Sequence, residues 1–85
     1  MFDPNGPFDE DMCNEILIEV SEKRKSEKTK HLSRIEHIAK SLGYDRYEVK
    51  NNAEYLIKIG YINKGLGGFL GLTGDGAAIV NQLLE

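Results

Sequence analysis

Apolar residues recur at helical spacing near the start of the chain. Between residues 9 and 25 they follow the i, i+3, i+4, i+7 pattern of one buried helix face, at Cys13, Ile16, Leu17 and Val20. Acidic residues open this segment and basic residues close it, which favours a helix because both complement the helix dipole. We therefore predict a helix over about residues 9–25 with Cys13 in the core, and a polar loop after it.

A second helix is predicted over about residues 33–42. Ser33 and Glu36 have the spacing of a capping box, in which each side chain satisfies a free backbone N–H of the first turn. Gly43 follows as the left-handed residue that commonly ends a helix. The inward face of this second helix carries Ile35, Ile38, Ala39 and Leu42.

A third helix is predicted over about residues 45–59. Asp45 and Glu48 repeat the capping-box spacing, and Gly60 marks the end. Its inward face carries Val49, Ala53 and Leu56. Two helices joined by so short a turn must cross steeply and share one core, so the pattern predicts a helix–turn–helix.

The period changes after Gly60, where a β-hairpin is predicted over about residues 61–73 with a glycine-rich turn at 65–68. Thr73 is expected to cap a last helix over about residues 74–84. That helix carries Gly76, Ile79, Val80 and Leu83. The predicted fold is therefore mainly α with a small β-hairpin, an α+β class.

Length and charge refine this picture. The 85 residues fit a single domain over residues 9–85, preceded by a flexible N-terminal arm over residues 1–8. The net charge is −3, but all 11 Lys and Arg residues lie between Lys23 and Lys64. Residues 21–65 hold these 11 bases against six acids. This asymmetry fits either a nucleic-acid partner or a plain solvated surface.

The sequence offers little for catalysis or for a membrane. It has no apolar run of about 20 residues, no secretory signal and a single cysteine, so we expect a cytoplasmic protein. His31 and His37 have no cysteine partner at metal-ligand spacing. No hydrolase, Walker or metalloprotease motif occurs. We expect no enzyme activity, no metal and no cofactor.

Three local motifs together resemble the winged helix–turn–helix family of small transcriptional regulators. The first is the stretch from Ser33 to Gly43, with an alanine at its packing point and a Leu-Gly ending. The second comprises Val49, Ala53, Leu56, Gly60, Tyr61 and Ile62. The third comprises Leu72, Thr73 and Gly76. The resemblance implies a three-helix core, a wing and a following helix, with His31 and Leu32 as a short first strand.

In that family the third helix enters the DNA major groove and the wing lies against the backbone or minor groove. Because an α-helix rotates by about 100° per residue, the outward face of the third helix carries a mixture of polar and charged residues. The DNA-contacting residues that the resemblance implies on this helix are Arg46, Tyr47, Lys50, Asn51, Glu54 and Lys58. Outside this helix, the candidates are Lys28, Lys30, Arg34 and Lys64. The wing tip itself carries no charge, and a plain solvated helix face remains the alternative.

The leading function is sequence-specific binding of double-stranded DNA by a small transcriptional regulator. A homodimer through the last helix would multiply its contacts, although that helix is also explained as a cap on the core. The alternative function is a winged-helix module that binds proteins within a larger assembly, without DNA contact.

Overall fold

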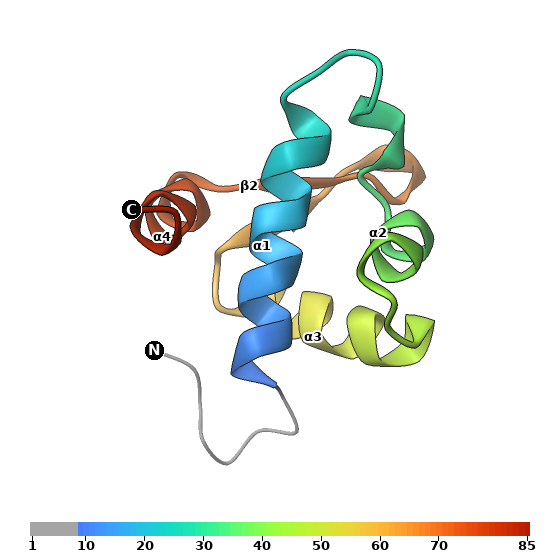
Figure 1. Ribbon diagram of the computed structural model, residues 1–85, viewed down its shortest axis with the longest axis horizontal. Helices are drawn as coiled ribbons and strands as arrows, with labels where there is room; N and C mark the ends of the chain where they lie inside the picture. The colour runs from blue at the N-terminus through green and yellow to red at the C-terminus, as the bar shows by residue number, and fades with distance from the viewer. Residues whose placement is uncertain (1–8) are drawn as a thin grey trace.

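A computed structural model describes residues 9–85, in which four α-helices accompany one two-stranded antiparallel hairpin (Figure 1). The helices are α1 (Glu10–Arg24), α2 (Ile35–Leu42), α3 (Arg46–Lys58) and α4 (Gly74–Leu83). The strands are β1 (Ile62–Lys64) and β2 (Leu70–Leu72), and two short 3-10 helices are η1 (Lys30–Leu32) and η2 (Leu66–Gly68). The predicted α+β class is confirmed. The arm predicted over residues 1–8 lies outside the described residues.

Helix α1 is the central element of the core. It begins at the N-cap Asp9, whose carboxylate accepts a hydrogen bond from the backbone N–H of Met12 at 3.1 Å. The predicted inward residues are all buried, as is Met12 beside them. Figure 1 shows α1 between α2 and α3 on one side and α4 on the other, and α1 contacts all three helices. Cys13 is confirmed as a core residue.

The turn between α2 and α3 forms as predicted, but only the Asp45 half of the predicted capping box is present among the described residues, since the Glu48 side chain makes no hydrogen bond back to Asp45. Gly43 adopts a φ of 75° and ends α2, and the Asp45 carboxylate accepts hydrogen bonds from the backbone N–H groups of Tyr47 and Glu48. Because the turn is so short, both helices pack their apolar faces into one core. The buried residues that they contribute are Ile38, Ala39, Val49, Ala53, Tyr55 and Leu56.

The start of α2 differs from the prediction. Arg34 is the N-cap and makes no capping bond through its side chain, whereas Ser33 is fully buried. The Ser33 hydroxyl donates to the carbonyl of Leu70 at 2.5 Å, and the Leu70 N–H donates to the Ser33 carbonyl at 2.8 Å. The capping box at Ser33 is therefore wrong, because strand β2 occupies the hydroxyl.

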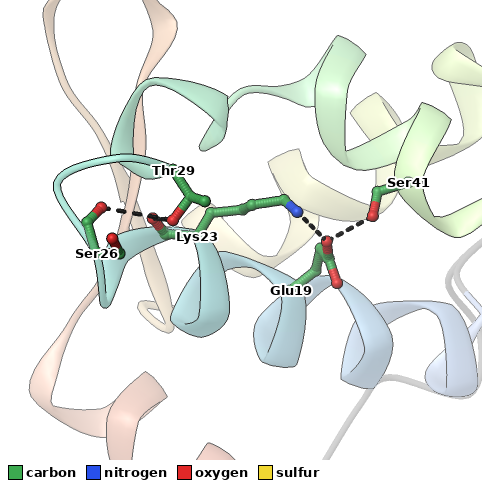
Figure 2. Close-up of polar contacts among 5 residues, drawn as sticks. All are labelled: Glu19, Lys23, Ser26, Thr29 and Ser41. Atoms are coloured by element: carbon green, nitrogen blue, oxygen red, sulfur yellow. Dashed lines mark hydrogen bonds and ion pairs between the residues drawn. The ribbon is translucent and has the colours of Figure 1, made fainter.

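The short strand implied at His31 and Leu32 is also wrong. Both residues belong to η1, in which the Leu32 N–H donates to the Thr29 carbonyl at 2.9 Å. Figure 2 shows why the chain turns here: the Thr29 hydroxyl donates to the carbonyl of Lys23 at 2.9 Å and folds the connection back onto the end of α1. Ser33, directly after η1, pairs with β2 through its hydroxyl and its carbonyl.

A polar contact joins α1 to α2. The Glu19 carboxylate lies 3.0 Å from the Lys23 ammonium and accepts a 2.7 Å hydrogen bond from the Ser41 hydroxyl (Figure 2). Burial alone would raise the pKa of Glu19, but the hydrogen bonds from Ser41 and Lys23 and the charge of Lys23 together lower it. The ionised carboxylate therefore links the two helices.

The hairpin leads directly into α4. Its register pairs Ile62 with Leu72 and Lys64 with Leu70. Thr73 caps α4 as predicted: its hydroxyl oxygen accepts a hydrogen bond from the Gly76 N–H at 3.0 Å.

Among residues 9–85, none of the helices combines the length and the apolar composition that a membrane span requires.

Candidate nucleic-acid interface

Four of the predicted basic site residues converge on one open groove of about 490 Å³, which we call the basic groove. It lies between the start of α2, the first turns of α3 and the hairpin tip. Its cations are Arg34, Arg46, Lys50 and Lys64, and the rest of its lining is Ile35, Glu36, Tyr47, Gly67 and Gly68. Residues up to 34 positions apart in the sequence therefore meet at one site.

Helix α3 supplies three of the nine residues that line the groove. Its buried residues turn inward, so Arg46, Tyr47 and Lys50 are left exposed on the other side. The Tyr47 side chain is 65% exposed, and the guanidinium carbon of Arg46 lies 5.6 Å from the centroid of its ring. This cation–π contact orients a charge and an aromatic face side by side.

Arg34 joins α2 to the hairpin tip. Its Nε donates a hydrogen bond to the carbonyl of Gly67 at 3.1 Å, and its guanidinium carbon lies 4.6 Å from the centroid of the Phe69 ring. A hydrogen bond and a stacked ring together hold the guanidinium in one place. Arg34 therefore has a structural role at the wall of the groove in addition to its charge.

The positive charge of the groove is not neutralised by the protein. Within residues 9–85, neither Arg46, Lys50 nor Lys64 forms an ion pair, and Glu36 is the one carboxylate in the lining. Elsewhere several cations are paired, such as Lys23 with Glu19 and Lys25 with Glu22. A concave surface with unpaired cations attracts anions, because its field is not cancelled locally.

The remaining predicted residues lie outside the groove. Asn51, Glu54 and Lys58 are exposed farther along α3. Lys30 lines a separate hollow of about 290 Å³ and lies 3.9 Å from Glu27. Lys28 is exposed in the connection after α1. The structure therefore brings Arg34 and Lys64 to the α3 site but does not bring Lys28 or Lys30 there.

The hairpin tip carries a feature that the sequence analysis missed. Leu66 is 96% exposed, and glycines surround it at positions 65, 67 and 68. The sequence does carry a signal for this feature, namely a leucine flanked by glycines in the predicted turn. It sits beside the basic groove, because Gly67 and Gly68 line that groove.

A second missed residue is Asn52, a buried polar side chain on the inward side of α3. Its Oδ1 accepts hydrogen bonds from the Asp9 N–H at 3.0 Å and the Cys13 thiol at 3.4 Å, while its Nδ2 donates to the Glu48 carbonyl at 2.8 Å. Burial, with smaller effects of Asp9 and Glu10, raises the pKa of Cys13 to about 11. The hydrogen bonds of Asn52 fix α1 against α3, and Asn52 does not line the basic groove.

Comparison of the chain with models of protein families, with curated proteins and with solved structures finds no match. The family resemblance drawn from the sequence motifs therefore stays a prediction.

Proposed function

We propose that this protein is a winged-helix DNA-binding domain that holds one sugar-phosphate strand of a duplex in the basic groove. The observation that carries the proposal is the meeting of Arg34, Arg46, Lys50 and Lys64 at one concave surface. Phosphate contacts supply the sequence-independent part of DNA affinity and fix the register of the protein on the duplex. The order of three helices and a hairpin is the one that the motif resemblance implies.

In this arrangement α3 enters the major groove. Beyond the basic groove of the protein, the exposed face of α3 continues with Asn51, Glu54 and Lys58. An asparagine amide pairs with the N6 and N7 positions of adenine, and a lysine contacts guanine or phosphate. Asn51 is therefore the proposed base-reading residue, and Arg46 and Lys50, which precede it on α3, are proposed to contact phosphate.

The biological role that fits this chemistry is a small transcriptional regulator. One such domain makes few base contacts, so a symmetric dimer on two half-sites is the economical arrangement. The candidate dimer element is α4, whose end exposes Leu83 at 38% and Leu84 at 55%. The same exposed leucines favour the second candidate function, a protein-interaction module in a larger assembly without DNA contact.

Fluorescence anisotropy of a labelled duplex, measured over a range of salt concentrations, tests the proposal. Four phosphate contacts predict a slope of log K against log salt of about −3.6, which weakens binding by about two orders of magnitude between about 50 mM and about 200 mM. Replacing Arg46, Lys50 or Lys64 by alanine should make the slope less negative by about 0.9 in each case. Each of these side chains is exposed, so the fold should be retained.

Lys40→Ala is the matched control. Lys40 is also an exposed cation on a helix, but it does not line the basic groove. Its replacement should leave the slope within error of the wild type. Absence of binding at about 50 mM salt would eliminate the DNA proposal and leave the protein-interaction module. Equal effects of all four variants would show a diffuse charge effect in place of a site.

A further inference from the structure

The hairpin tip is built around one apolar side chain that nothing in the domain covers. Leu66 is 96% exposed, the highest value among the large hydrophobic residues of the described chain. A single exposed leucine is ordinary on a protein surface. Leu66 differs from such a residue because hydrogen bonds hold the tip that carries it and because this tip lies beside the basic groove.

Three hydrogen bonds hold the tip. The Gly65 N–H donates to the Phe69 carbonyl at 2.8 Å, the Gly68 N–H donates to the Gly65 carbonyl at 3.2 Å, and Arg34 holds the Gly67 carbonyl. Gly67 has a φ of 77°, and a Cβ there would lie 3.1 Å from the Phe69 ring. The turn therefore requires a glycine beside Leu66 and keeps the leucine as the only side chain at its apex.

The tip also lies at a defined place relative to the proposed DNA. A sugar-phosphate strand separates the major from the minor groove of a duplex. When that strand occupies the basic groove, α3 on one side faces the major groove and the hairpin tip on the other side faces the minor groove. The minor groove is only about 6 Å wide, which suits a turn flanked by glycines.

We infer that Leu66 is a wedge that enters the minor groove and partly unstacks one base step of the bound duplex. Apolar side chains inserted between base steps kink DNA in this way, and pyrimidine–purine steps yield most easily because their stacking is weak. An uncharged tip then contributes through shape and apolar contact while the cations of the basic groove supply the electrostatic attraction. The inference rests on the proposed function, because it needs the duplex to be seated in that groove.

The experiment uses the full chain with two labelled duplexes of equal length. One contains repeated TA steps with 2-aminopurine at several of them; the other is an A-tract with the same fluorophore and no pyrimidine–purine step. Wild-type protein should raise the 2-aminopurine fluorescence of the TA duplex and shorten its end-to-end distance measured by energy transfer. The A-tract duplex should show little of either change, because its stacking is stiff.

Leu66→Ala should bind the TA duplex about tenfold more weakly, since the apolar area of the leucine is no longer buried. It should abolish the fluorescence rise but keep the wild-type salt slope, because no phosphate contact is lost. Leu66→Met should retain much of the signal. Lys40→Ala removes an exposed side chain that lies outside both the basic groove and the hairpin tip, and it should change nothing in these measurements.

The outcomes separate this inference from the proposed function. Salt-dependent binding with no fluorescence rise, or Leu66→Ala behaving as the wild type, overturns the wedge and leaves the basic groove as the DNA site. Failure of the wild type to bind either duplex overturns both. A change of oligomeric state in Leu66→Ala without DNA would assign the tip to a protein contact and also overturn the wedge.

Discussion

Replacing Gly76 by alanine tests how the hairpin is joined to α4. Gly76 is buried in the first turn of α4, and a Cβ at this position would overlap the backbone carbonyl oxygen of Tyr61 and lie 2.9 Å from its carbonyl carbon. The obstructing atoms belong to the backbone next to β1, so no side chain can rotate away. Because the obstructing atoms are backbone, the overpacking cost lies at the upper end of its usual range, about 3 kcal/mol, and the gain in helix propensity of about 1 kcal/mol offsets only part of it.

We expect Gly76→Ala to lower the free energy of unfolding by about 2 kcal/mol. For a domain of this size that corresponds to a fall in Tm of about 8–16 °C. Thermal unfolding followed by circular dichroism measures the shift, and urea unfolding gives the free energy. DNA binding below the transition should be unchanged, because Gly76 does not line the basic groove.

Gly74→Ala is the matched control, two residues earlier in the same helix. A Cβ at Gly74 meets nothing within 4 Å, and its φ is not in the left-handed region. Alanine should therefore stabilise the protein by about 0.4–1 kcal/mol through the unfolded chain. If Gly76→Ala is as stable as Gly74→Ala, the close approach of α4 to the Tyr61 carbonyl is refuted.

Three further predictions concern the core and its polar contacts. Ser33→Ala should lower the free energy of unfolding by about 1–2 kcal/mol in urea, because the buried carbonyl of Leu70 loses a hydrogen bond; a change below about 0.5 kcal/mol would contradict this role. Cys13, buried and with its pKa raised to about 11, should react with a thiol reagent at neutral pH only as fast as the protein opens, and prompt labelling would argue against the packing of α1. Glu19 has a folded-state pKa below its ordinary value of 4.5, so its contribution to stability is complete above about pH 4.5 and is lost as the pH falls through the folded pKa. Carboxyl NMR titration should show that Ser41→Ala raises this pKa, and an unchanged midpoint would exclude the hydrogen bond of Figure 2.

Most of the helices were predictable because their signals are local. The Asp45 cap, the Gly43 stop and the Thr73 cap each act within about four residues. The apolar period of α1 likewise needs only neighbouring positions. Local patterns of this kind determine where helices begin and end, and the structure follows them closely.

The errors arose where a distant partner decides the outcome. Ser33 has the spacing of a cap, but Leu70, 37 positions away, takes its hydroxyl. Asn52 makes a bond to Asp9 at a separation of 43, which explains how a polar residue comes to be buried on α3. Neither partner is visible in a short window of sequence.

The candidate site, too, was predictable where its signals are local and not where residues distant in the sequence come together. The outward face of α3 followed from the helical period, so Arg46 and Lys50 were predicted as exposed cations. That Arg34 and Lys64 join them depends on the docking of the hairpin tip against the start of α2, through the hydrogen bond from Arg34 to Gly67. The groove is therefore a tertiary feature, although each of its cations was already a candidate.

The most direct test of the central proposal is an amide chemical-shift map of the ¹⁵N-labelled protein titrated with a short duplex. The proposal predicts the largest shifts around the basic groove, at Arg46, Tyr47, Lys50, Gly67 and Gly68, with α4 unaffected by the first equivalent of DNA. Shifts confined to α4, or no shifts at low salt and excess DNA, would contradict it.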